Sequence, residues 1–238
     1  YTLLMTAIGH VLAPSMYKSL PYDTVEDFAG VSRIATGRVL IVANPNNVPA
    51  RDINELIDLA KKNPGRFTYG SSGPGTFMHV AVEVFKNHTD VDLLHVPYRS
   101  GSEAINAVLS GHIDLTLCSV PNCTQHIADG RMKALAFIGD ERSPLAPNIP
   151  SIVELGINGY DISSYNMLLA PKGTPPAVLK KLHKAVDEVV RSPQFAEAIL
   201  RSGFTPTPSE SPEEVDQFVR DEVIYWKKAL ETAGVTPS

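Results

Sequence analysis

Cysteine is scarce in this sequence, and basic residues are too few to balance the acidic ones. Only Cys118 and Cys123 are present, and their C-x4-C spacing matches neither a thioredoxin motif nor a zinc knuckle. Two buried apolar thiols are one interpretation and a disulfide is the other, because spacing leaves the geometry of a bridge open. The 26 acidic residues exceed the 21 lysines and arginines, so the net charge is −5, without a basic block. This argues against nucleic acid and against an anionic membrane surface as partners.

Long apolar runs and targeting signals are missing as well. No apolar run approaches the roughly 18 residues of a membrane span. The chain begins at Tyr1 and shows no signal peptide, so we expect a processed or excised piece. Its 238 residues suit one large domain or two small ones, at about 100–200 residues per domain. The proportions of hydrophobic residues (43%) and charged residues (20%) are ordinary for a globular protein.

Patterns that indicate metal binding or catalysis are absent too. The seven histidines form no H-x-x-x-H pair and no H-E-x-x-H motif, so neither a metal nor a cofactor is expected. No Ser-His-Asp set follows from spacing, and the acidic residues are scattered. We therefore expect a binding protein without catalysis, with an α/β enzyme as one alternative.

What recurs in the sequence is a short apolar strand, a turn rich in Gly, Ser and Pro, and then a helix. This alternation predicts βα units, a mainly parallel sheet and helices on both of its faces. The predicted strands lie at 1–6, 38–43, 67–70, 93–96, 113–118, 133–138 and 166–170. After residue 170 the pattern is helical, and Ser211 to Glu214 reads as a capping box that opens a long helix.

This organisation predicts two lobes. The outer lobe combines residues 1–43 with residues 162–238, and the inner lobe comprises residues 44–161. The chain then crosses twice, near Ala43–Asn47 and near Asp161–Ser164. Such a double hinge lets two lobes close over a ligand.

The most informative segment is the turn Gly70–Thr76 (GSSGPGT), between a predicted strand and a helix. Glycines allow close backbone approach, and the N–H groups at a helix start suit a carboxylate or a phosphate. A plain tight turn with an N-cap is the alternative. The turn is not a P-loop, because no lysine follows the glycines. Its candidate ligand-binding residues are Ser71, Ser72, Gly75, Thr76 and His79.

Two more turns of the inner lobe, Pro97–Gly101 and Cys118–Asn122, follow predicted strands. In an open α/β sheet such turns gather at the carboxyl edge of the strands, where ligands bind. Arg99 is either a carboxylate clamp or a solvated arginine. Thr6–His10 offers a matching edge on the outer lobe. The candidates from these segments are Cys118, Ser119 and Gly9.

Six segments together resemble the Bug, or TctC, family of solute receptors of tripartite tricarboxylate transporters, along essentially the whole chain. They are YTLLM at 1–5, LPYD at 20–23, YGSSGPGT at 69–76 with His79, HVPYRSG at 95–101, ALA at 134–136 and LAPKGTP at 169–175.

The resemblance implies a type II periplasmic-binding-protein fold, α/β in class, with two lobes around a cleft and a double-crossing hinge. It also implies a periplasmic location, a small carboxylate ligand and delivery of that ligand to membrane permease subunits. In family terms, the turn Ser71–Thr76 with His79 looks like the distal-carboxylate site. Tyr165 matches a position at the second crossing where the family often has an aromatic residue beside the cleft, and hinge packing is its alternative.

Two departures from the family pattern lead to predictions. Nothing matches the family's front strand and P-F-x-x-G-G loop, so we expect an exposed sheet edge, with self-association or weakened binding. Many members carry Asp where Cys118 stands, so an acid without an α-amino group is expected to be preferred. A ligand-sensing domain of a regulator remains an alternative function, although no helix-turn-helix is visible.

Overall fold

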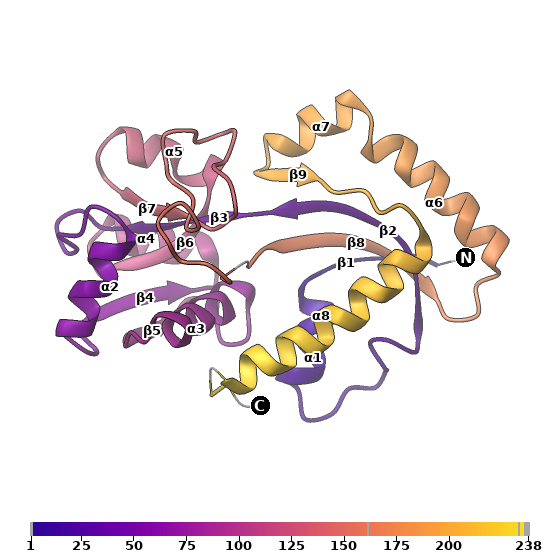
Figure 1. Cartoon of the computed structure of the whole chain (residues 1–238), viewed down its shortest axis with the longest axis horizontal. Helices are drawn as coiled ribbons and strands as arrows, with labels where there is room; N and C mark the ends of the chain where they lie inside the picture. Colours follow the sequence, from indigo (N-terminus) through magenta and orange to yellow (C-terminus); the bar gives the residue numbers. More distant parts are fainter. Residues whose placement is uncertain (1, 161, 233, 236–238) are drawn as a thin grey trace. The chain divides into compact units, whose positions relative to one another are not determined.

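A computed structural model describes residues 2–160, 162–232 and 234–235 of the chain (Figure 1). Its packing divides the chain into unit 1, Tyr1–Gly37 with Ser164–Ser238, and unit 2, Arg38–Ser163. The strands are β1 (Leu4–Ala7), β2 (Phe28–Gly37), β3 (Val39–Ala43), β4 (Phe67–Ser71), β5 (Leu93–Pro97), β6 (Leu115–Ser119), β7 (Lys133–Phe137), β8 (Ser164–Pro171) and β9 (Phe204–Pro206). The helices are α1 (Gly9–Met16), α2 (Ile53–Lys62), α3 (Phe77–Thr89), α4 (Gly101–Leu109), α5 (Val120–Ala128), α6 (Pro176–Val190), α7 (Pro193–Leu200) and α8 (Pro212–Thr232).

Unit 1 contains a four-stranded sheet in the order β1-β8-β2-β9. Every described pairing in it is antiparallel, so the predicted parallel sheet is wrong for this unit. The reason is that β8 brings the chain back to unit 1 and runs opposite to both β1 and β2. Among the described strands, the strand–helix alternation produces parallel pairing only for β4, β5 and β6, in the middle of the chain.

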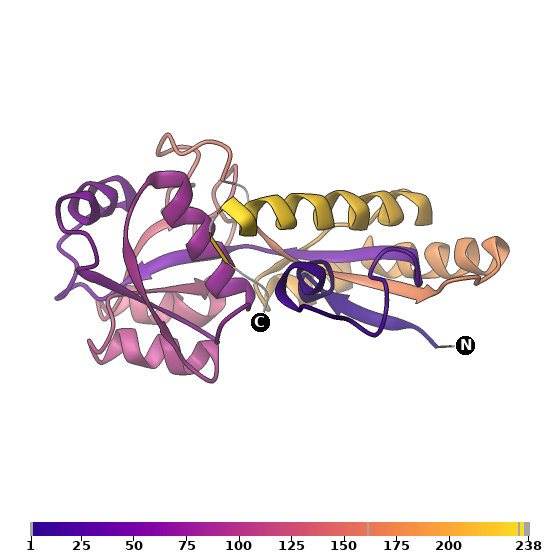
Figure 2. The same cartoon turned by 90° about the horizontal axis from the view of Figure 1, so that it is seen from below.

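Helix α8 packs against β2 and α1 and lies over the sheet of unit 1 (Figure 2). Half of the predicted capping box is present at its start, and the returning bond of Glu214 goes to the residue before the cap. Ser211 Oγ accepts from the backbone N–H of Glu214 at 3.2 Å, and the Glu214 carboxylate accepts from the N–H of Glu210 at 2.6 Å. The apolar stripe of the helix is buried at Val215, Val219, Trp226 and Leu230.

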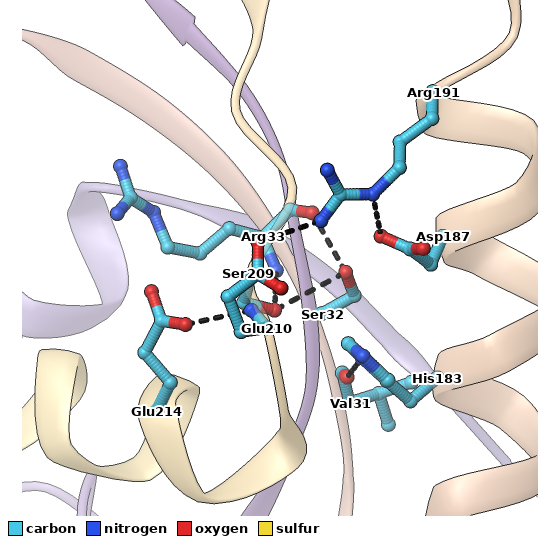
Figure 3. Close-up of polar contacts among 9 residues, drawn as sticks. All are labelled: Val31, Ser32, Arg33, His183, Asp187, Arg191, Ser209, Glu210 and Glu214. Carbon is cyan, nitrogen blue, oxygen red and sulfur yellow. Dashed lines mark hydrogen bonds and ion pairs between the residues drawn. The ribbon is translucent and has the colours of Figure 1, made fainter.

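The segment that leads into α8 is also tied to β2 and to the end of α6 (Figure 3). Ser209 Oγ lies 3.4 Å from Ser32 Oγ on β2, and both residues are fully buried. Arg191, which follows α6, donates to Asp187 at 2.7 Å and to Glu210 at 2.8 Å. These bonds fix where α8 begins on the sheet.

Unit 2 contains a five-stranded mixed sheet in the order β5-β4-β6-β3-β7. Strands β5, β4 and β6 are parallel neighbours, as predicted, whereas β3 is antiparallel to both β6 and β7. A core cluster includes residues of β3 and β6 and both cysteines. The α/β class is therefore confirmed, with mixed sheet topology in place of a mainly parallel one.

The first predicted boundary lies too late in the chain. Val39 pairs with Ser119 and Ala43 with Leu115, so β3 belongs to unit 2, and Arg38 alone separates it from β2. The error arises because an apolar strand shows no preference for either sheet until its partners are known. The second change of unit falls between Ser163 and Ser164, whereas Asp161, where the predicted crossing begins, lies outside the described residues.

Strand β1 lies at the edge of its sheet and is shorter than the predicted strand at 1–6, of which Tyr1 lies outside the described residues. Leu4 and Met5 are exposed at 38% and 58%. Exposed apolar side chains on an edge strand are the feature on which the expected self-association depends. That expectation stays a prediction. Among the described residues, no helix combines the length and apolar character needed to cross a bilayer.

Candidate functional site

Three strand-to-helix turns of unit 2 meet at one edge of its sheet. Strands β5, β4 and β6 are neighbours and run in the same direction, with Ser71 opposite Pro97 and Gly70 opposite Thr116. Helices α4, α3 and α5 follow these strands in turn (Figure 1). The carboxyl ends of parallel strands are where open α/β sheets bind ligands.

The helix starts at this edge differ in how they are capped. At α4, Ser100 Oγ accepts from the N–H of Glu103 at 3.2 Å, which closes that helix start. At α3, the N-cap residue Thr76 makes no capping bond, because its hydroxyl donates to the carbonyl of Gly73 at 2.8 Å. The N-cap side chain therefore leaves the first-turn N–H groups of α3 free to bind an anion.

Helix α5 also lacks a capping bond from its N-cap side chain, and it follows β6, the strand next to β4. Ser119 occupies its N-cap position in an extended conformation without a side-chain cap bond, and the residue is half-buried. Two neighbouring turns thus present open helix N-termini. Each carries partial positive charge, which favours a carboxylate.

The turn between β4 and α3 depends on its glycines and on Ser71. Gly73 and Gly75 have φ angles of 115° and 74°, a region that side chains disfavour. Ser71 Oγ accepts from the N–H of Gly73 at 3.1 Å and lies 2.7 Å from Nε2 of His95. Because Ser71 is fully buried, the prediction that its hydroxyl contacts a ligand is not supported. Its side chain fills the inside of the turn.

His79 does reach the turn from the first turns of α3, as the sequence predicted. Its Nδ1 accepts from the backbone N–H of Gly75 at 3.2 Å. Burial lowers the pKa of His79, so the ring is neutral at neutral pH. A neutral ring with Nδ1 as acceptor carries its proton on Nε2. This leaves one N–H donor on a half-buried side chain, alongside the half-buried residues Ser72, Gly75 and Thr76.

Sequence reasoning missed His95 as a component of this site. The ring of His95 lies 4.3 Å from that of His79 and 4.8 Å from that of Tyr69, measured between centroids. Burial, and then the proximity of His79, lower the pKa of His95 to about 4. The relevant signal is the β4–β5 register, which places His95 opposite Tyr69, and no sequence pattern reveals that register.

An ion pair on α3 lies next to this group of rings. The Tyr69 hydroxyl donates to Glu83 at 2.6 Å, and Lys86 Nζ lies 2.9 Å from the same carboxylate. Burial and the neighbouring Glu83 carboxylate raise the pKa of Tyr69. The charges of Glu83 and Lys86 therefore offset each other, and the rings beside them are neutral.

Cys118 does not lie where the sequence placed it. The residue is only 2% exposed, belongs to the core cluster of unit 2, and donates from its thiol to the carbonyl of Ser119 at 3.4 Å. A hydrogen bond with Cys123, together with burial, raises its pKa. The expected ligand contact of Cys118 is thus not supported, because its side chain faces the apolar core. Both cysteines are free and buried, which confirms the interpretation as two apolar thiols.

The remaining two candidates lie in unit 1. Gly9 is exposed at the start of α1, and a Cβ added there meets nothing within 4 Å. Tyr165 is 3% exposed, its hydroxyl donates to Glu222 at 2.8 Å, and its ring packs edge-on against Phe218 at 4.8 Å. Burial and the Glu222 carboxylate raise its pKa. Tyr165 is therefore a core residue, which favours its alternative interpretation as packing.

Within the described part of the chain, no three His, Cys, Asp or Glu side chains are placed to hold a metal ion.

The family model described as "Tripartite tricarboxylate transporter family receptor" (TctC) matches residues 1–235. The chain belongs to the TctC family.

Similar proteins and solved structures match nearly the whole chain. A protein encoded in the tcbD–tcbE intergenic region of Pseudomonas sp. (strain P51) is 32% identical over 231 residues, which are 97% of this chain and 68% of that protein. The structure "R. palustris Rpa4515 with adipate" is 29% identical with a TM-score of 0.85, covering 100% of this chain and 79% of that one. The periplasmic binding protein BugD is 28% identical with a TM-score of 0.82, covering 100% and 80%. The predicted periplasmic-binding-protein fold is confirmed by these neighbours.

Proposed function

We propose that this chain is a periplasmic receptor that binds a small carboxylate at the β4–α3 and β6–α5 turns and delivers it to the permease subunits of a tripartite tricarboxylate transporter. The observation that carries the proposal is the pair of uncapped helix N-termini on neighbouring turns, in a chain of the TctC family. The adipate named with a relative supports the carboxylate class.

The chemistry of recognition is hydrogen bonding rather than pairing with a cation. First-turn N–H groups of α3 and of α5 supply donors, except at Pro121 of α5, which has no N–H. Ser72, Ser119 and Nε2–H of His79 add side-chain donors. A carboxylate accepts several such bonds, and each strengthens where water is excluded. Gly9 is retained as a proposed ligand-binding position in unit 1 because its exposed backbone is open to close approach.

The class of acid is narrowed by Cys118, the penultimate residue of β6. Cys118 is a thiol with a raised pKa, so it supplies no negative charge. Because its side chain also faces the core, Cys118 brings no anion to the turn that could bind a ligand amino group. The proposal therefore favours an acid without an α-amino group, such as glutarate over glutamate.

We propose a binding role without catalysis. The contact between Ser71 and His95 is the feature that would favour an enzyme instead. At 2.7 Å the two side chains resemble a nucleophile with its base. The Ser71 side chain is fully buried and also bonded within its own turn, so it is not available to attack a substrate. A binding role fits this geometry better.

Isothermal titration calorimetry with matched acid pairs tests the proposal. Adipate, glutarate and 2-oxoglutarate are titrated into the chain beside glutamate and aspartate. We expect micromolar binding of at least one acid, with glutarate tighter than glutamate. Binding of no acid below millimolar concentration contradicts the receptor function, and glutamate bound more tightly than glutarate contradicts the ligand class.

A further inference from the structure

Fully buried Ser71 and half-buried His95 form a hydrogen-bonded pair that the proposed function leaves without a role. Ser71 Oγ contacts Nε2 of His95 at 2.7 Å and the N–H of Gly73 at 3.1 Å. Ser71 is the last residue of β4, whereas His95 lies on the neighbouring strand β5. The hydrogen bond therefore ties the turn before α3 to a second strand of the sheet.

His95 reaches the same turn by a second route, through the ring of His79. The two imidazoles are 4.3 Å apart between centroids and tilted by 33°, and His95 also stacks on Tyr69 at 4.8 Å. His79 in turn accepts from the N–H of Gly75. A change at His95 thus disturbs both ends of the turn, through Ser71 at one end and through His79 at the other.

We propose that His95 is a positioning residue for the carboxylate site: by bonding Ser71 and packing on His79, it holds the Gly73–Thr76 turn and leaves Nε2–H of His79 to donate. The inference rests on the proposed function. His95 acts through its two neighbours and does not contact the ligand itself.

The charged groups around the two imidazole rings do not themselves position His79. Glu83 and Lys86 of α3 are paired with each other, and the hydroxyl of Tyr69 on β4 donates to Glu83. The pKa values of both imidazoles are lowered, mainly by burial, so both rings are neutral at neutral pH. The tautomer of His79 is then set by its bond to Gly75 and by the ring packed against it.

Calorimetry with adipate as the probe tests the positioning role in the whole chain. H95F retains an aromatic ring but loses the bond to Ser71, and we expect it to weaken adipate binding about tenfold. S71A is expected to weaken adipate binding similarly. The S71A/H95F double variant is expected to bind adipate no more weakly than the single variant with the lower affinity, because the two residues act as a unit. H95Q keeps an N–H donor and is expected to bind within about threefold of wild type. H112F, at an exposed histidine of unit 2, is the matched control and is expected to change nothing.

Two calorimetric results overturn the inference, provided that urea unfolding shows each variant to be folded. One is wild-type affinity in H95F. The other is a double variant whose loss of adipate affinity equals the product of the fold-losses in the two single variants. If H95F does not fold, the adipate affinity of H95Q decides the matter. An affinity of H95Q as low as that of S71A contradicts the positioning role.

A ligand-free measurement separates this inference from the proposed function. Long-range proton–nitrogen NMR of the imidazoles is expected to show His79 as the Nε2–H tautomer in wild type and as a tautomer mixture in H95F. If wild type binds neither adipate nor any other acid, the proposed function fails and these spectra alone decide. A mixture already present in wild type, or an unchanged His79 in H95F, overturns the inference.

Discussion

At the scale of single residues, the ring pair of His79 and His95 makes stability depend on pH. Both pKa values lie below the ordinary value of 6.5 in the folded chain, and that of His95 falls to about 4. The unfolded chain therefore binds protons first as the pH falls. The stabilisation is fully present above pH 6.5 and is lost as the pH falls through about 4.

We predict that the free energy of unfolding falls between pH 7 and pH 4.5, with about 1 kcal/mol of the fall due to His95 after allowing for solvent screening of a half-buried ring. Urea unfolding of wild type and H95Q across this range measures it. The difference in stability between the two proteins should shift with pH by that amount. A difference that stays constant contradicts the assignment to His95.

The Tyr165 hydroxyl provides a second test at this scale. Y165F removes the donor at 2.8 Å from Glu222, which is then left with the indole N–H of Trp226 at 2.9 Å. We expect a loss of about 1–2 kcal/mol in the free energy of unfolding, with adipate affinity unchanged. Y17F, at an exposed tyrosine, serves as the control in the same urea titrations. A loss of affinity without a loss of stability would return Tyr165 to the ligand site.

At the scale of elements, the contrast between capped and uncapped helices leads to a prediction. T76D places a carboxylate at the N-cap of α3, where it competes with a bound anion for the same N–H groups. We expect adipate affinity to fall more than tenfold while the free energy of unfolding changes by less than about 1 kcal/mol. S100A, which uncaps α4, should do the reverse, costing about 1 kcal/mol of stability and leaving affinity intact. Calorimetry and urea unfolding of both variants are compared, and tight adipate binding by T76D contradicts the anion site.

The same scale shows how far the sequence alone leads. The Ser211 capping bond of α8 and the glycine turn before α3 could be predicted because each depends on neighbours within four residues. The antiparallel placement of β3, the burial of Ser71 and the contact between Ser71 and His95 could not. Each depends on which strands pair and in which register, and that is decided by packing between distant segments.

At the scale of the whole molecule, unit 2 is a single continuous segment with a complete sheet. All five strands of that sheet lie within residues 38–163, and its core cluster is drawn from the same segment. We predict that this segment, produced alone, unfolds cooperatively in urea and gives dispersed amide NMR signals. Circular dichroism is used to follow its unfolding. Tryptophan fluorescence does not serve, because Trp226, the one tryptophan of the chain, lies in unit 1. A non-cooperative transition would show that unit 2 requires unit 1 to fold.

The burial of both thiols has a practical consequence for studying this receptor. Cys118 and Cys123 are shielded within the core of unit 2, so a maleimide dye added to the native chain has no accessible sulfur to attack. A single cysteine introduced at exposed Pro74 of the turn before α3 would then take up the dye alone, without prior removal of the natural cysteines. Fluorescence from that one position would convert the chain into an optical sensor for the acid it binds.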